Sequence, residues 1–290
     1  MTTVLRPPLV SIVMSMLNSE ATVGAAVRSL QLQTLEDWEL IVIDNGSFDR
    51  SASIVKEFND ARIRLVCETS CTVLATRLNQ AVALSRGDFI ARMDADDVCF
   101  PERLARQVER LRQDPQLDLV GCGAVVFTDG AELLGELPAE LNHEEITAQP
   151  FHGFPLPHPT WCGRADWFRN HPYDPDIIGA EDQDLLLRTF RTSKFGSLET
   201  VLFGYRQNQL HLRKLLPGRR ALVRSLWRYA RQSGQFWSPL GGIARHVIKG
   251  AVDIATISLG LNHLAQLYRL EPVSPSIMQQ WQDLLNRLER

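Results

Sequence analysis

The sequence is poor in cysteine and in long apolar runs. It has 5 cysteines among 290 residues and no CxxC pair, so we expect neither a zinc site nor disulfides, and a reducing compartment. No stretch of about 18 uninterrupted apolar residues occurs, and the N-terminus lacks a basic region followed by a long apolar segment. We therefore expect a cytoplasmic protein that neither carries a signal peptide nor spans a bilayer.

A large net charge is also missing. The formal charge is −3 at pH 7, so nothing global indicates a nucleic-acid partner. The distribution is uneven, because Arg206 to Lys249 contains ten Lys or Arg and no Asp or Glu. Four of these cations recur at helical spacing among Leu and Trp residues: Arg220, Arg224, Arg228 and Arg231. That pattern fits a helix lying on an anionic membrane surface, and it fits equally a helix face packed on the rest of the protein.

The first half of the chain alternates strand and helix patterns. Strand patterns cover residues 9–16, 38–44, 63–67 and 88–94, and helix patterns cover 21–33, 49–59 and 73–85. Repeated βα units predict an α/β fold with a mostly parallel central sheet, flanking helices, and ligand-binding loops at one sheet edge. Beyond it we expect a helix at 101–112, a strand at 119–128, a polar helix-inclined segment at 129–149, a Pro- and aromatic-rich loop at 150–173, a helix at 182–192 and a strand at 198–205.

Three carboxylates follow the fourth predicted strand. Asp94, Asp96 and Asp97 come directly after the apolar run 89–93, just before Pro101. Open α/β sheets bind ligands at the carboxyl ends of their strands. Clustered carboxylates repel one another, and a hard divalent cation such as Mg²⁺ or Mn²⁺ offsets that repulsion. The alternative is a solvated acidic turn that caps the helix beginning near Pro101.

Two other acidic motifs lie at element boundaries. Asp44 ends a strand and precedes a Gly-containing turn. Its carboxylate suits a base or ribose, although Asp is also common in ordinary turns. Glu181 and Asp182 adjoin a helix pattern. One of them suits a general base for a sugar hydroxyl, although acidic residues also stabilise any helix N-terminus.

In order and spacing these motifs resemble the family 2 glycosyltransferases, nucleotide-diphospho-sugar enzymes with a GT-A fold. The matching pieces, within roughly residues 8–206, are Val10-Ser11-Ile12-Val13, Gln33-Thr34 before Trp38-Glu39-Leu40, Asp44-Asn45-Gly46-Ser47, the run from Gly87 to Asp97, His158-Pro159-Thr160 and Glu181-Asp182. The resemblance implies a Rossmann-like GT-A catalytic domain over residues 1–210. Its nucleotide-sugar half would extend to about residue 100 and its acceptor half over 101–210, followed by a helical, basic extension over 211–290.

The resemblance also implies donor-binding roles. Asp44 would hold the base of the nucleotide, with Ser15 and Asn18 lining the same pocket. Asp94 and Asp96 match the DXD motif of the family. Of the two, Asp96 is favoured as the metal ligand, and Asp94 suits the ribose or a nearby donor contact as well as the metal.

Catalytic and acceptor roles follow in the same way. Asp182 matches the general base. An acceptor hydroxyl would then attack the anomeric carbon from the face opposite the diphosphate, so that the configuration of this carbon is inverted. Glu181 would support Asp182. Trp161 would offer a face to a sugar ring and His158 a hydrogen bond. Arg206 would contact a phosphate. Each of the last three is also an ordinary structural residue in the alternative interpretation.

Some features depart from the family pattern. Ser15 stands where Pro is frequent and Asn45 where a second Asp is common, which leaves the contacts to the base open. The chain lacks a QxxRW motif and a transmembrane bundle, which argues against a processive synthase.

The sequence therefore predicts a metal-dependent, inverting, non-processive hexosyltransferase-type enzyme. It would use a UDP-sugar and a glycan or lipid-linked glycan acceptor, in the cytoplasm or at the inner face of its membrane. A catalytically silent nucleotide-sugar-binding protein or a membrane-docked scaffold is the alternative. A sugar-nucleotide pyrophosphorylase is disfavoured, because the segment 16–20 is not a Gly-rich basic loop.

Overall fold

The first four predicted strands form a parallel, buried sheet. The computed structural model describes residues 6–137, 139, 141–207, 212–234, 236–259 and 270–289. β1 (Val10–Met16), β2 (Trp38–Asp44), β3 (Ile63–Cys67) and β4 (Phe89–Arg92) lie in the order β3-β2-β1-β4 and pair in parallel. Every residue of β2 is buried, as expected for a strand covered by helices on both faces. The helices between them are α1 (Val23–Gln31), α2 (Ser51–Glu57) and α3 (Leu74–Leu84).

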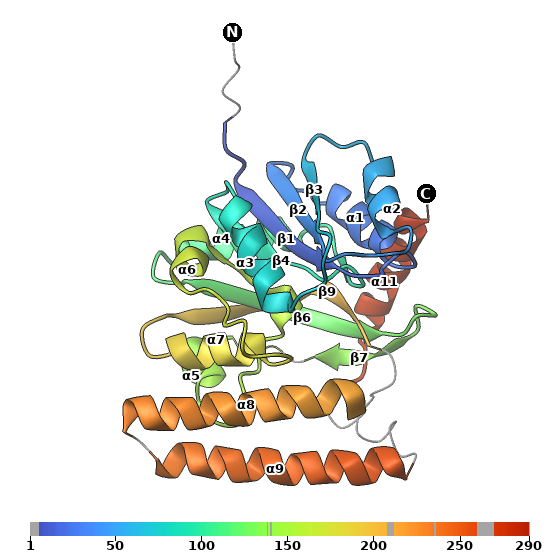
Figure 1. Cartoon of the computed structure of the whole chain (residues 1–290). Helices are drawn as coiled ribbons and strands as arrows, with labels where there is room; N and C mark the ends of the chain where they lie inside the picture. Colours follow the sequence, from blue (N-terminus) through green and yellow to red (C-terminus); the bar gives the residue numbers. More distant parts are fainter. Residues whose placement is uncertain are drawn as a thin grey trace.

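The second half adds antiparallel strands to the same sheet. β8 (Cys162–Arg164) lies between β4 and β6 (Leu119–Phe127) and is antiparallel to both. β9 (Phe195–Arg206) runs parallel to β6. The remaining elements of this half are β5 (Val98–Cys99), α4 (Arg103–Gln113), β7 (Leu133–Leu137), α5 (His143–Ile146), the 3₁₀ turn η1 (His158–Thr160), α6 (Ala165–Asn170) and α7 (Glu181–Thr189). One sheet therefore joins both halves of the chain (Figure 1).

One expected helical segment is in part a strand. The region 129–149 has a polar composition, yet β7 occupies residues 133–137 and pairs antiparallel with β6. Pairing with the edge of an existing strand outweighs a weak local helix preference. Only the short helix α5, capped by Asn142, remains helical there.

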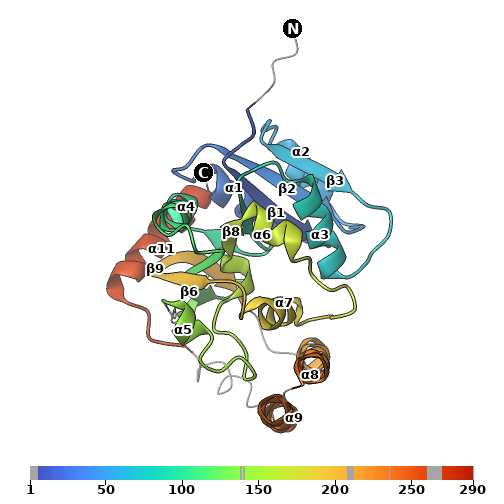
Figure 2. The same ribbon diagram turned by 90° about the vertical axis from the view of Figure 1, so that its left-hand side faces the viewer.

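The C-terminal helices divide into two groups. α8 (Leu212–Ser233) and α9 (Trp237–Ser258) form a hairpin beneath α7, with α9 outermost (Figures 1 and 2). α11 (Pro275–Leu288) returns to the sheet, where Trp281 packs 4.7 Å from the Phe127 ring and also contacts Phe100. The expected boundary near residue 210 lies outside the described residues, so that division stays a prediction. Of the helices that the structure describes, none combines the length and apolarity needed to cross a bilayer.

Candidate active site

The carboxyl edge of the parallel strands brings two of the acidic motifs together. Met16 of β1 is in register with Asp44 of β2, and Val13 with Arg92 of β4. Asp44 and Asp94 therefore end strands on either side of β1. Because neighbouring strands lie about 4.8 Å apart, the two residues are on the order of 10 Å apart across the sheet. That separation matches a site that one extended ligand can cross.

The loops after β1 and β2 are fastened to each other beside Asp44. The Asp44 Oδ1 atom accepts hydrogen bonds from the Ser47 backbone nitrogen (3.0 Å) and hydroxyl (2.5 Å). The Ser47 hydroxyl oxygen accepts one from the Asn18 backbone nitrogen at 2.9 Å. Asn18 Oδ1 accepts one from the Phe48 nitrogen at 3.1 Å. Asp44 and Asn18 thus lie side by side in the two joined loops, and the half-buried Ser15 is near the end of β1.

The DXD region is a compact cluster of three carboxylates. Oxygens of Asp94, Asp96 and Asp97 lie within 4.8 Å of one another. Burial and the neighbouring Asp94 raise the pKa of Asp96, and the same causes together with Asp96 raise that of Asp97 well above its ordinary value. The buried Oδ2 of Asp97 has no hydrogen-bond partner among the described residues. An all-oxygen set with an unsatisfied buried ligand atom fits a hard divalent cation.

Arg92 is a cation of this cluster that no sequence pattern singles out. It is only 2% exposed. Its guanidinium forms a bidentate ion pair with Asp94, with N–O distances of 2.6 and 2.5 Å. Its charge also lowers the pKa of His158 and opposes the raised pKa of Asp182. A strand residue facing inward looks like any other in the sequence, so only the fold reveals this role.

Arg103 is a second functional residue that sequence reasoning missed. It is fully buried in α4. Its Nη2 donates to the carbonyl oxygens of Arg92 (2.7 Å) and Pro159 (2.9 Å). One side chain thereby fixes the η1 turn against β4, next to the acidic cluster. In the sequence it is one of several Arg residues in an amphipathic helix, which gives no sign of burial.

Arg206 supports the acidic cluster through protein contacts. Its backbone nitrogen donates to Asp97 Oδ1 at 2.7 Å, and its Nε donates to the Asp96 carbonyl oxygen at 2.6 Å. Its Nη1 pairs with Asp129 at 3.1 Å. The structural interpretation of Arg206 accounts for all of these contacts; a phosphate contact stays a prediction.

Glu181 and Asp182 are the first two residues of α7. Gln183 donates from Nε2 to Asp182 Oδ2 at 3.1 Å. Glu181 Oε1 accepts from the Gly179 nitrogen at 2.8 Å. Burial is the main cause that raises the pKa of both carboxyls. A raised pKa makes the Asp182 carboxylate a stronger base than a solvated Asp.

Tyr173 connects the two acidic regions. Its pKa is raised, mainly by burial and further by the charges of Asp182, Glu181 and Asp94, while Arg92 lowers it. One buried phenol therefore senses carboxylates from both sides. Tyr173 therefore lies within electrostatic range of both acidic regions.

The aromatic loop is a support rather than an exposed platform. His158 Nε2 lies 2.8 Å from the Tyr173 hydroxyl oxygen. Burial and the Arg92 charge lower the His158 pKa well below its ordinary value, so the ring is neutral. Trp161 is 0% exposed and its Nε1 donates to the Leu156 carbonyl oxygen at 3.0 Å. The expectation that Trp161 offers a face to a sugar ring is wrong, because the indole is buried in the core. Its ring packs against His158, with 4.6 Å between the ring centroids.

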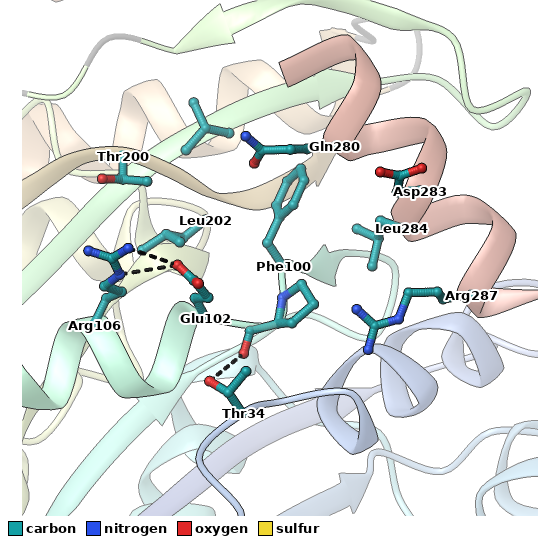
Figure 3. Close-up of a pocket in the computed structure, with 12 residues that line it drawn as sticks. Thr34, Phe100, Glu102, Arg106, Thr200, Leu202, Gln280, Asp283, Leu284 and Arg287 are labelled. Atoms are coloured by element: carbon teal, nitrogen blue, oxygen red, sulfur yellow. Dashed lines mark hydrogen bonds and ion pairs between the residues drawn. The ribbon is translucent and has the colours of Figure 1, made fainter. Parts of the chain in front are cut away.

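A cavity of about 510 Å³ lies beneath α11, away from these side chains (Figure 3). Phe100, Gln280 and Leu284 face one another across it, and Arg106 pairs with Glu102 on one wall. None of the acidic residues of the three motifs, Asp44, Asp94, Asp96, Asp97, Glu181 and Asp182, lines it. A separate cavity, also of about 510 Å³, is lined by Asp182.

Comparison with known proteins agrees with this geometry. The family model of glycosyl transferase family 2 matches residues 11–170. EpsE of Bacillus subtilis (strain 168) is 32% identical over 212 residues, covering 69% of this chain and 74% of EpsE. The Escherichia coli UDP-Glc:alpha-D-GlcNAc-diphosphoundecaprenol beta-1,3-glucosyltransferase WfgD is 37% identical over 103 residues, which is 36% of this chain and 41% of WfgD. S. aureus TarS 1–349 in complex with UDP-GlcNAc has a similar fold, with a TM-score of 0.64, 14% identity, and coverage of 97% of this chain and 80% of that chain.

The fold and the acidic edge define a GT-A glycosyltransferase. The chain belongs to glycosyl transferase family 2, as its motifs indicated. The expectations of fold class and of a glycosyltransferase enzyme are therefore confirmed.

Proposed function

We propose that this glycosyltransferase inverts the anomeric carbon and moves one sugar from a UDP-sugar to a glycan or lipid-linked glycan. The observation that carries the proposal is the cluster of Asp94, Asp96 and Asp97 after β4, whose oxygens lie within 4.8 Å of one another. Such a cluster supports a metal-bound diphosphate site at the carboxyl ends of the parallel strands, and the buried Asp182 carboxyl at the start of α7 supplies a candidate base. The UDP-GlcNAc bound by TarS and the UDP-glucose named for WfgD support a UDP donor. The diphosphoundecaprenol in the name of WfgD supports a lipid-linked acceptor.

Each residue has a defined task in this mechanism. Asp44 and Asn18 orient the nucleotide at the edge of β1 and β2. Asp96, with Asp94 and Asp97, would hold Mn²⁺ or Mg²⁺, which when bound neutralises the departing diphosphate. Asp182 takes the proton of the acceptor hydroxyl as that oxygen bonds to the anomeric carbon and the bond to the diphosphate breaks.

Replacing Asp96 by Ala should weaken Mn²⁺-dependent UDP binding by about 100-fold, because a charged ligand contributes roughly 1.5–3 kcal/mol. Calorimetry with UDP, in Mn²⁺ and in EDTA, measures this. Asp166→Asn is the matched control, since its side chain is 88% exposed and pairs with Arg169 on the surface. Unchanged binding in Asp96→Ala would reject the metal assignment.

Release of UDP by the same two proteins distinguishes an enzyme from a binding protein or scaffold. Wild-type protein with UDP-sugars and Mn²⁺ should release UDP slowly without an acceptor, and Asp96→Ala should not. A catalytically silent nucleotide-sugar-binding protein would bind UDP, either in both Mn²⁺ and EDTA or in Mn²⁺ alone. It would release no UDP from a UDP-sugar. Absence of UDP release across a panel of UDP-sugars would favour that alternative.

We also propose that the chain docks on an anionic membrane surface, through α9 more than through α8. Arg228 of α8 pairs with Asp174, and Arg224 donates to the Asp176 carbonyl oxygen, so these cations face the catalytic domain. α9 instead exposes a stripe of apolar side chains, among which Ile248 is 63% exposed. The stripe consists of Trp237, Val247, Ile248, Val252 and Leu259. Between residues 215 and 259 seven Lys or Arg accompany a single acid, Asp253. An apolar stripe with cationic surroundings fits an anionic lipid interface.

The double variant Ile248→Asp/Val252→Asp should bind vesicles containing anionic lipid on the order of 100-fold more weakly, since burying each aliphatic side chain contributes about 1.5 kcal/mol or more. Sedimentation with the vesicles gives the bound fraction. Met278→Asp on α11, 49% exposed in the wild type, is the control and should bind normally. Equal retention of both variants in the pellet would contradict the role of α9.

A further inference from the structure

The cavity beside Asp182 brings the candidate base next to basic side chains from another part of the chain. It has a volume of about 510 Å³ and lies between the start of α7, the loop 152–155 and the hairpin of α8 and α9. Asp182, His152, Arg219, His246 and Lys249 all line it. Figures 1 and 2 show α8 directly beneath α7, with α9 beyond it. None of Asp94, Asp96 and Asp97 lines this cavity, so its cations are not those of the metal cluster.

Two close backbone contacts build the cavity walls. A Cβ atom on Gly218 of α8 would collide with the carbonyl oxygen of Gly179, three residues before Asp182. A Cβ atom on Gly242 of α9 would collide with the carbonyl oxygen of Phe151. Both helices are therefore held against the loops of the catalytic domain at positions where only glycine fits. The space between them is a fixed feature of the fold.

The cavity is electropositive. Burial first, and then Arg245 and Lys249, lower the pKa of His152. Burial first, and then Lys249 and Arg219, lower the pKa of His246 to about 4. Both imidazoles are neutral at pH 7 for that reason. Asp182 is the acidic residue that lines the cavity, and Asp253 pairs with Arg219.

His246 has hydrogen-bonding capacity that its protein contacts leave largely unused. The side chain is 5% exposed, and the Phe151 backbone lies near enough to raise its pKa, but neither ring nitrogen has a hydrogen-bond partner of ordinary geometry among the described residues. A buried polar group without a partner costs free energy unless something in the site completes it. A neutral imidazole N–H beside two cations suits an anionic oxygen.

We propose that this cavity binds a phosphate or diphosphate ester of the acceptor, next to the sugar whose hydroxyl Asp182 deprotonates. The inference depends on the proposed function for the role of Asp182, but the anion site itself does not. Lys249 and Arg219 supply the charge and His246 donates a hydrogen bond. The negatively charged ester of the acceptor then binds in the cavity beside Asp182, and the diphosphate of the donor binds at the metal site of Asp96. Because the two sites are separate, acceptor and donor do not compete for the same cations.

Inorganic pyrophosphate in EDTA is the probe, since without a divalent metal the donor site should not hold it. Titration calorimetry on the full chain should show that Lys249→Gln weakens binding at least tenfold. Arg220→Gln is the matched control, because Arg220 is exposed on α8 and does not line the cavity. Lys249→Arg should restore affinity, and circular dichroism verifies that each variant is folded. Equal affinity in Lys249→Gln and Arg220→Gln would overturn the proposal.

Two further arms separate this site from the donor site. Asp96→Ala should bind pyrophosphate in EDTA as the wild type does, and Lys249→Gln should bind UDP with Mn²⁺ normally. Loss of pyrophosphate binding in Asp96→Ala would place the anion at the donor site and overturn the proposal, whereas failure of UDP binding by the wild type would count against the proposed function alone. Farnesyl diphosphate identifies the source: tighter binding than pyrophosphate assigns a lipid-borne ester, and equal binding a soluble one.

Discussion

Asp182→Asn should lower the turnover number for sugar transfer by about 10²–10⁴-fold, the usual contribution of a general base. The amide cannot accept the hydroxyl proton, yet it keeps the shape of the side chain and its contact with Gln183. The dissociation constant for UDP in Mn²⁺ should therefore change little. Steady-state transfer assays and calorimetry on the same preparation measure both quantities.

The neighbouring carboxyl is the control for this assignment. Glu181→Gln keeps an oxygen that accepts from the Gly179 nitrogen, so its turnover should stay within a fewfold of wild type. Turnover in Asp182→Asn equal to wild type, or a larger loss in Glu181→Gln, would rule out Asp182 as the base.

The pH profile gives an independent check. Burial raises the Asp182 pKa above 3.8, and only the ionised carboxylate accepts a proton. The rate should therefore fall as pH decreases through that raised pKa. The acid limb of kcat/KM should lie above pH 3.8 and disappear from the residual activity of Asp182→Asn.

Arg92→Met should cost about 3–5 kcal/mol of unfolding free energy in EDTA at pH 7, the usual penalty for removing one partner of a buried ion pair. The variant would leave Asp94 without its bidentate partner and would remove a charge that lowers the pKa of Asp96 and of Asp97. Urea denaturation followed by circular dichroism measures the change. Transfer activity should be lost as well, because the same guanidinium orients the DXD carboxylates.

An exposed ion pair provides the comparison for Arg92. Arg106 pairs with Glu102 on the surface, with side chains 53% and 55% exposed, and such pairs contribute about 0–1 kcal/mol. Arg106→Met should therefore leave the free energy of unfolding nearly unchanged. If Arg92→Met costs no more than Arg106→Met, the ion pair with Asp94 does not hold the cluster together.

The framework of the site was predictable because its signals are local. Apolar runs ended by carboxylates located β2 and β3 with the bounds that the structure gives, and parallel pairing then required Asp44 and Asp94 to share one edge. The short strand β8 was not predictable, since three residues carry no periodicity and only pairing with β4 and β6 makes them a strand.

Side-chain direction was the part that the sequence could not supply. The arginine pattern of α8 is compatible with solvent, lipid or protein, and only the fold turns Arg228 toward Asp174. The exposed stripe lies on α9, whose Gly and Ala residues weaken its apolar signal. Burial likewise decides the role of Trp161, because the sequence of an aromatic loop is compatible both with an exposed sugar-binding ring and with a core residue.

The contact between α11 and the segment after the acidic cluster has a consequence for synthesis. Trp281 fills the space beside Phe100 and Phe127, and the Leu288 carbonyl oxygen accepts a hydrogen bond from Arg28 of α1. The polypeptide cannot close this core until residues 275–288 have left the ribosome. A nascent chain that already contains every carboxylate of the site would therefore still leave Phe100 and Phe127 without the packing of Trp281.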